Sequence, residues 1–331
     1  MTRRNLITDV PGLKVGHAQD EKLASGVTAI VFDSPAAASL AIHGGAPGVR
    51  DTALLDPEMT VERVDALVLS GGSAFGLDAM GGAQAALRAA GRGFDVGGMR
   101  VPIVPGAILF DLLNGGDKDW GVRPPYWDLG FAATQAAGPD FALGTAGAGY
   151  GATTANLAGG LGSASAVTSR GFHVGALVAV NALGQATIGS GPHFWAAPYE
   201  RDGEFGALGW PAPPPADALA CALKGDLPQN TTIAVVATDA ALGKPQCRRL
   251  AVQAHDGLAH ALRPAHAALD GDLVFAAATG LAASAPDLRD LTEIGMVGAD
   301  CLARAVARAI HAARTLPHPG ARLCWRDRFG R

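Results

Sequence analysis

Residues 227–239 read LPQNTTIAVVATD, a short loop that runs directly into an apolar segment. The β-branched and hydrophobic run 231–238 predicts a strand that is covered on both faces of its sheet. A hydroxyl residue, Thr231, stands at the first position of this strand. If the Asn230–Thr231 bond is cut, Thr231 carries a hydroxyl nucleophile and its own α-amine, a base with a pKa of ~7.7–8.0. Before the cut the same nitrogen is an amide, so the uncut chain is expected to be inactive.

Two other interpretations of these residues compete with a nucleophile. Asn230-Thr231-Thr232 fits the N-glycosylation sequon, which matters only in a secreted protein. The N-terminal sequence MTRRNLITDV has no apolar signal core, so we expect no secretion. The other alternative is a strand that simply begins with threonine. On these residues alone the plain strand start is favoured, and the nucleophile gains its support from motifs elsewhere in the chain.

The composition disfavours several classes of protein. With 331 residues, 49% of them hydrophobic, the chain can bury the core of one large domain or two small ones. Because the net charge is −4 and no basic block occurs, we expect no nucleic-acid partner. Segment 141–199 has no Asp or Glu but is rich in Gly, Ala, Ser and Thr, which predicts close-packed interior rather than a membrane span. The four cysteines have no metal-binding spacing and indicate reduced thiols of a cytoplasmic protein.

Strand and helix patterns alternate along the chain. Continuous apolar runs predict buried strands at 26–33, 65–69, 173–180, 231–238 and 273–279. Helical periodicity occupies 74–90, 244–262 and 297–316. The proline cluster 210–215 is the best candidate for a linker, and it precedes Thr231. The order of elements predicts a layered α/β or α+β protein.

Two glycine-rich motifs have a functional and a structural interpretation. SGGSAFG (70–76) places Ser73 between a strand and a helix, as in a nucleophile elbow, but that motif requires Gly where Phe75 stands. GAGYGA (147–152) matches a dinucleotide fingerprint, but no acidic residue follows about twenty residues on. A tight turn and close backbone packing are therefore the better interpretations, and we expect no cofactor.

Three groups of polar residues are candidates for a site. Asp270 and Asp272 bracket a turn before strand 273–279, either as a plain strand entry or as paired carboxylates, and the absence of further ligands nearby disfavours a metal. Asn181 ends strand 173–180, where its amide could cap a turn or donate to an oxyanion. The histidines at 255, 260 and 266 do not share one helical face, so surface or capping positions are expected.

A series of short segments, spread nearly from one end of the chain to the other, carries a resemblance to a known family. They are ITDVPGLKVGH (7–17), GGAPG and RDT (44–52), SGGSAFGLD (70–78), VPIVPGAILFD (101–111), GAGYGA (147–152), GGLGSAS (159–165), NTTIAVVATD (230–239), HDG (255–257) and DGD (270–272). In this order and coverage the chain resembles the L-aminopeptidase/D-esterase family of self-cleaving hydrolases. That family includes β-aminopeptidases and endohydrolases of nylon (6-aminohexanoate) oligomers.

The resemblance implies a four-layer αββα sandwich in a single domain, 1–331. It implies a precursor cut into fragments 1–230 and 231–331 that stay associated and assemble into a homo-oligomer. It makes Thr231 the nucleophile, Asn181 the oxyanion-side amide, and Asp270 and Asp272 the acidic pair. No metal or cofactor is implied.

Two positions depart from the family pattern. Phe110 stands where some members carry an active-site tyrosine, and Asn156 stands where nylon hydrolases carry a lysine. With Ser73, these residues are the candidate substrate contacts. We expect an amide hydrolase acting on short peptides or amino-acid amides. The alternatives are an endo-amidase of 6-aminohexanoate oligomers, an acetyl-transferring relative of the ornithine acetyltransferases, and a binding protein that never cleaves.

Overall fold

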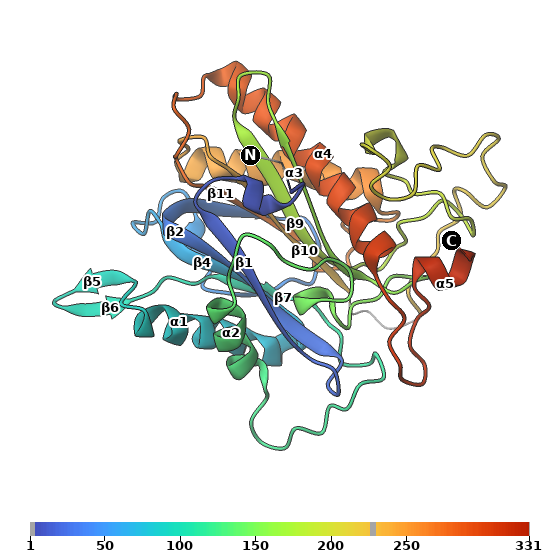
Figure 1. Ribbon diagram of the computed structural model, residues 1–331, viewed down its shortest axis with the longest axis horizontal. Coiled ribbons are helices and arrows are strands. Elements are labelled where there is room, and N and C mark those ends of the chain that lie inside the picture. The colour runs from blue at the N-terminus through green and yellow to red at the C-terminus, as the bar shows by residue number, and fades with distance from the viewer. Residues whose placement is uncertain (1–3, 226–229, 331) are drawn as a thin grey trace.

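The computed structural model describes residues 4–225 and 230–330, and in it two β-sheets are stacked between two pairs of helices (Figure 1). One sheet contains β1 (Leu13–Asp20), β2 (Ser25–Ile42), β4 (Val64–Ser70), β7 (Gly106–Ile108) and β3 (Gly48–Arg50). The other contains β11 (Leu273–Ala278), β10 (Thr231–Thr238), β9 (His173–Asn181) and β8 (Gly160–Val167). The long strand β2 belongs to both sheets: its first half pairs with β1 and β4, and its last six residues pair with β11.

Four helices cover the outer faces of the sheets. α1 (Ala79–Ala89) and α2 (Tyr126–Gln135) pack on the first sheet, and α3 (Lys244–Ala261) and α4 (Leu288–Ala312) pack on the second (Figure 1). A third apolar cluster lies between the sheets and includes Ile30, Leu67 and Phe275. These three cores separate four layers, so the αββα sandwich is confirmed.

Strand β10 shows why its sequence has no polar alternation. Val235 faces the core between the sheets, whereas Val236 faces the core under α3 and α4. Side chains of a strand alternate between the two faces of its sheet, and here both faces are covered. All eight residues of β10 are consequently buried.

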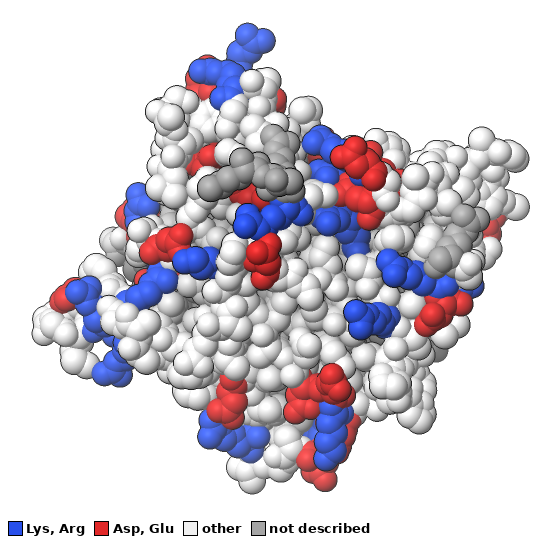
Figure 2. Space-filling model, viewed as in Figure 1, with Lys and Arg blue, Asp and Glu red and all other residues white. Residues whose placement is uncertain are grey.

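Small elements complete the chain and lie mainly in its connections. They are the strands β5 (Phe94–Val96) and β6 (Met99–Val101), the helix α5 (Trp325–Phe329), and the 3-10 helices η1 (Ile7–Asp9), η2 (Ala53–Leu55), η3 (Ser73–Asp78), η4 (Gly147–Gly149) and η5 (Ala197–Tyr199). Among the described residues no helix is both long and apolar enough to cross a membrane. On the face in Figure 2 basic and acidic side chains are interspersed.

The expected strands all form, but some boundaries and elements differ from expectation. The predicted helix 74–90 opens with the 3-10 turn η3 and becomes α-helical only at Ala79. Helix α4 begins nine residues before the predicted start, because the Asp287 carboxylate caps it by accepting from the amides of Arg289 and Asp290. β1, β8 and α2 were not predicted as elements, although β8 and β9 do make segment 141–199 largely buried.

Candidate active site

The first residue of β10 lies where three strand ends meet. β9 runs antiparallel to β10 and β11 runs parallel to it, so the end of β9 and the start of β11 flank the start of β10. In this register Asn181 is the partner of Thr231, and Asn230 bridges to Asp270. The topology therefore brings together Thr231, Asn181 and the acidic pair. Residues 227–229 of the loop that enters this strand lie outside the described residues.

The hydroxyl of Thr231 faces the peptide bond that precedes it. Its Oγ donates to the Asn230 carbonyl oxygen at 2.5 Å, and the backbone N–H of Gly271 donates to the same oxygen at 2.9 Å. Thr231 is only 4% exposed. A Cβ at Gly271 would lie 2.6 Å from this Oγ, so glycine gives the hydroxyl its room. The arrangement sets a hydroxyl group beside a carbonyl that an N–H already polarises.

The acidic pair holds the backbone around Thr231. Asp272 accepts from the backbone N–H of Thr232 at 3.0 Å and from that of His266 at 2.8 Å. Asp270 accepts from the backbone N–H of Leu183 at 3.1 Å, and from that of Gly271 at 3.0 Å. Both carboxylates are buried. They position the strand ends that carry the site.

The two carboxyl groups differ in their affinity for a proton. Burial and then the negative charge of Asp272 raise the pKa of Asp270. Burial also acts to raise the pKa of Asp272, but hydrogen bonds led by those from His266 outweigh it and lower that pKa overall. The proximity of the two buried carboxyl groups therefore favours a proton on the pair, and the first of the two to ionise is Asp272.

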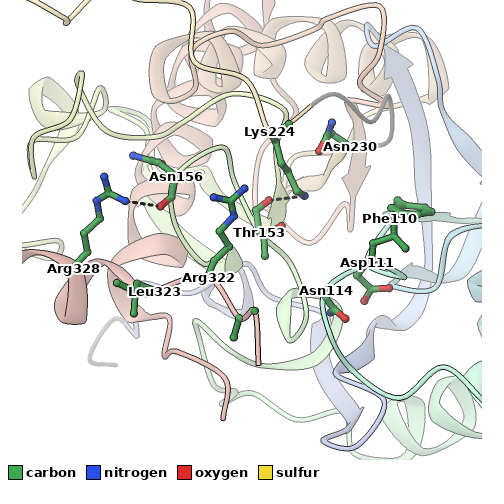
Figure 3. A pocket seen from close by; sticks show the side chains of 14 residues that line it. Phe110, Asp111, Asn114, Thr153, Asn156, Lys224, Asn230, Arg322, Leu323 and Arg328 are labelled. Atoms are coloured by element: carbon green, nitrogen blue, oxygen red, sulfur yellow. Dashed lines mark hydrogen bonds between the residues drawn. The ribbon is translucent and has the colours of Figure 1, made fainter. Parts of the chain in front are cut away.

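Lys224, which lines the pocket (Figure 3), connects it to Asn181. The Asn181 side-chain oxygen accepts from the backbone N–H of Thr153 at 3.0 Å and from Lys224 Nζ at 2.8 Å, and its amide nitrogen donates to the Phe110 carbonyl at 2.9 Å. An amide has a second N–H, which stays available to an oxyanion. Asn181 is thus oriented by three partners.

Lys224 is the functional candidate that the sequence did not reveal. Besides Asn181, its ammonium contacts the Thr153 carbonyl at 3.1 Å, and its backbone N–H donates to the Leu183 carbonyl. Burial lowers the pKa of Lys224 to about 7. A lysine in a loop is ordinarily a surface residue, and no motif surrounds this one, so only the contacts identify it.

A cavity of about 590 Å³ opens beside these residues. Among the residues that the structure describes, its charged lining consists of Lys224, Arg322 and Arg328 with a single acid, Asp111 (Figure 3). The Asp111 carboxylate accepts from Ser25 Oγ at 2.6 Å and from the Gly72 N–H at 2.8 Å, and burial raises its pKa. Among the described lining residues, cationic side chains therefore predominate.

The three candidate substrate contacts have different positions. Phe110 and Asn156 line the cavity. The Asn156 amide donates to Thr187 Oγ at 2.9 Å, so this residue is held by its own neighbours. Ser73 begins η3 with a φ of 53° and is not among the described residues that line the cavity.

The surface placement expected for the histidines is wrong for two of them. His255 is 1% exposed because α3 packs it against the second sheet, and its Nε2 contacts the Ala41 carbonyl. His266 is half-buried beside Asp272. His260 is exposed, as expected, and stacks on Tyr199.

The profile of peptidase family S58 matches residues 5–323. The chain belongs to peptidase family S58. It is 44% identical over 331 residues to an uncharacterized aminopeptidase of Mycobacterium tuberculosis, with 92% of this chain and 93% of the relative covered.

Two further relatives extend the comparison. A 6-aminohexanoate-oligomer endohydrolase of Agromyces sp. is 26% identical over 294 residues, which cover 84% of this chain and 76% of the relative. The solved L-aminopeptidase D-Ala-esterase/amidase of Ochrobactrum anthropi superposes with a TM-score of 0.68 at 22% identity, covering 96% and 89% of the two chains. The expected family resemblance is confirmed, and the chain is a hydrolase of peptide or amide bonds.

Proposed function

We propose that this chain is an aminopeptidase-like hydrolase that matures by cutting its own Asn230–Thr231 bond and then uses Thr231 as its N-terminal nucleophile. Its substrates are short peptides or amino-acid amides. Fragments 1–230 and 231–331 remain associated, because β10 is buried between β9 of the first fragment and β11 of the second.

One observation carries the proposal. Thr231 Oγ lies 2.5 Å from the Asn230 carbonyl oxygen, which also accepts from the Gly271 N–H. Attack of Oγ on the Asn230 carbonyl carbon forms an ester and frees the Thr231 nitrogen as an amine. Water then opens the ester and releases the Asn230 carboxylate. The new α-amine accepts the proton of the hydroxyl when a substrate is attacked.

The test uses two neighbouring threonines as a matched pair. Wild-type protein should give fragments of 230 and 101 residues, the smaller beginning at Thr231, whereas Thr231→Ala should remain one chain. Thr232→Val should still be cut, because the side-chain oxygen of Thr232 has no hydrogen-bond partner among the described residues. Cleavage of Thr231→Ala at the same bond would overturn the proposal. A single uncut wild-type chain without activity would instead favour a binding protein.

A second candidate is an endo-amidase acting on 6-aminohexanoate oligomers. The basic side chains among the described cavity residues favour it, because such oligomers end in a carboxylate. Asn156 stands where nylon hydrolases carry a lysine, but Lys224 supplies a cationic side chain to the same cavity. An aminopeptidase needs an acidic or carbonyl partner for the substrate amine, and Asp111 is the one acid among the described lining residues. Hydrolysis of amino-acid p-nitroanilides, their N-acetylated forms and the oligomers by processed enzyme distinguishes the two. Equal turnover of N-acetylated substrates would favour the endo-amidase.

A further inference from the structure

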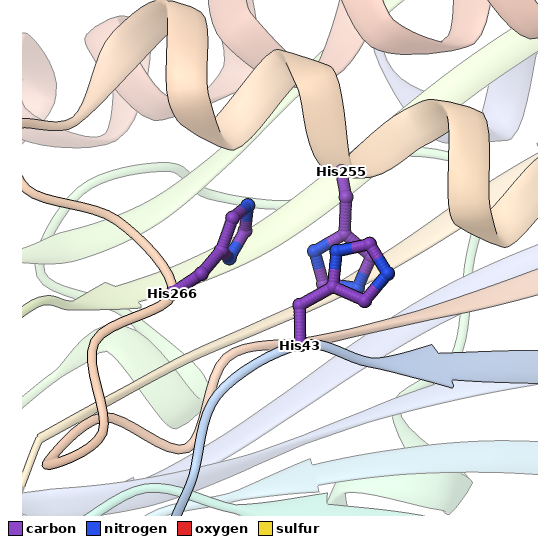
Figure 4. Close-up of side chains that lie close together, drawn as sticks. All are labelled: His43, His255 and His266. Carbon is purple, nitrogen blue, oxygen red and sulfur yellow. The ribbon is translucent and has the colours of Figure 1, made fainter.

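Three histidines from distant parts of the chain converge (Figure 4), and one of them, His266, contacts Asp272 of the acidic pair. His43 follows β2, His255 lies in α3, and His266 lies in the loop before β11. One nitrogen atom from each lies within 4.8 Å of the others. None of the three is among the described residues that line the cavity, so this cluster is distinct from the substrate site.

His255 has one nitrogen occupied and one bare. Its Nε2 lies 3.0 Å from the Ala41 carbonyl, which can only accept, so Nε2 carries the proton. Its Nδ1 is therefore a lone-pair atom, and it has no hydrogen-bond partner although the side chain is 1% exposed. A buried, unpartnered acceptor of this kind is unfavourable unless something binds it.

His266 has the same asymmetry. Its Nδ1 lies 3.3 Å from a carboxylate oxygen of Asp272. In the tautomer that carries its proton on Nδ1, this proton faces the carboxylate and the lone pair is on Nε2. An acceptor behind one ring nitrogen and a bare nitrogen in front is the usual arrangement of metal-binding histidines.

His43 supplies the adjustable part of the cluster. Its ring is exposed, has no hydrogen-bond partner among the described residues, and stacks on His255 with a centroid distance of 3.8 Å and an interplanar angle of 17°. Parallel rings cannot direct their lone pairs at one ion, so His43 must rotate about its side-chain torsions on binding. His266 already lies at steep angles to the other two rings.

We infer that His43, His255 and His266 form a binding site for Zn²⁺ or a divalent ion of similar preference, with water as the fourth ligand. Imidazole nitrogen is a preferred zinc ligand, and three protein ligands plus water is a common coordination. Because Asp272 contacts both His266 and the Thr232 N–H, the ion would stabilise the position of this carboxylate. It would not contact the substrate.

The test measures binding directly on the full-length protein. After removal of metal with a chelator, wild-type protein is titrated with Zn²⁺ by calorimetry and with Co²⁺ by visible absorption. We expect one ion per chain and the intense bands of tetrahedral Co²⁺. His43→Ala should weaken Zn²⁺ binding at least ~10-fold, since it removes a ligand at an exposed position. His260→Ala, an exposed histidine on the same helix as His255, should bind like wild type.

Several results would overturn the inference. These are the absence of binding at micromolar Zn²⁺, equal affinity in wild type and His43→Ala, or a weak octahedral Co²⁺ spectrum. Thermal melting of His43→Ala without metal checks that the fold is retained, and an unchanged melting temperature makes the binding comparison valid. If His43→Ala melts earlier, His43→Gln replaces it, since glutamine keeps the size of the side chain but is a poor zinc ligand.

Discussion

The side chain of Asn181, the strand partner of Thr231, is held in place by hydrogen bonds to its neighbours. The side-chain oxygen of Asn181 accepts from the ammonium group of Lys224, and its amide nitrogen donates to the Phe110 carbonyl. An amide whose oxygen accepts from a cation cannot flip without losing that contact, so Lys224 orients Asn181. Lys224 is half-buried, and desolvation of its ammonium group lowers its pKa.

Lys224 should therefore make stability depend on pH. Its pKa is about 7 in the folded chain and near 10.5 when exposed, so the unfolded chain binds more protons between these values. Stability should rise with pH across this window relative to Lys224→Met, by at most ~1.4 kcal/mol per pH unit. The raised pKa of Asp270 makes stability fall as the pH rises above 3.8. Because Asp270 is present with and without the Lys224→Met substitution, its effect is common to the two proteins compared.

Thermal or denaturant unfolding of the uncut Thr231→Ala chain, with and without Lys224→Met, measures this difference from pH 6 to 10. Lys14→Met is the control, because Lys14 is exposed and pairs with Asp33 on the surface. Parallel stability profiles for the Lys224 and Lys14 variants would contradict the burial of an ammonium group.

At the scale of elements, the site exists because three strand ends coincide. β9 ends at Asn181, β10 begins at Thr231, and β11 begins at Leu273, directly after the acidic pair. The parallel β10–β11 pair places Gly271 against Asn230, where its N–H reaches the carbonyl oxygen. The geometry of the Asn230–Thr231 peptide bond is thus a property of strand register.

Gly271→Ala should block or slow the cut. The new Cβ would lie 2.6 Å from Thr231 Oγ and 2.7 Å from the Ala46 carbonyl oxygen, so the hydroxyl or the loop must move. We expect maturation to slow at least tenfold, since positioned attack is lost by small displacements, and stability to fall by ~1–3 kcal/mol. A gel time course of purified protein measures the uncut fraction.

Gly191→Ala is the matched control for this substitution. Its Cβ would meet only the Ile188 carbonyl oxygen, at 3.5 Å, which is an ordinary contact. If Gly271→Ala matures as fast as Gly191→Ala, Gly271 does not hold the Asn230 carbonyl for attack.

At the scale of the whole molecule, the sandwich places the cavity at the edge where loops from both halves of the chain meet. Phe110 and Thr153 enter it from the N-terminal part, and Arg322 and Arg328 enter it from the C-terminal tail. The chain as a whole is acidic, with a net charge of −4, whereas this cavity collects three cationic side chains. The described lining of the cavity is therefore richer in cationic side chains than the chain as a whole.

This distribution predicts a preference for substrates with a free carboxylate. A short peptide should have a higher kcat/KM than its C-terminal amide. Arg322→Ala should reduce the ratio of these two kcat/KM values by ~2–5-fold, the range expected of an exposed ion pair. Arg326→Ala, which alters an exposed arginine outside this cavity, should leave the ratio unchanged. Faster hydrolysis of the amides by wild-type enzyme would contradict a role for the cationic lining.

Local sequence was enough to predict the elements and residues that carry their own signal. The unbroken apolar run of β10 marks a strand buried on both faces, and Thr231 at its start marks the candidate nucleophile. Asp270 and Asp272 were identified by their place before the next strand. Boundaries such as the start of α4 were missed because a single cap at Asp287 decides them.

Only the tertiary structure decided which distant residues meet. Lys224 becomes a partner of Asn181, and His43 becomes a neighbour of His255, through packing that joins residues 43 and 212 positions apart. Sequence periodicity describes the neighbours within one strand or helix, whereas these contacts depend on the register of strands and the packing of layers. The strand that begins at Thr231 could thus be predicted from its own residues, whereas the role proposed for Thr231 comes from the family resemblance, and the charges and histidines around it depend on the whole sandwich.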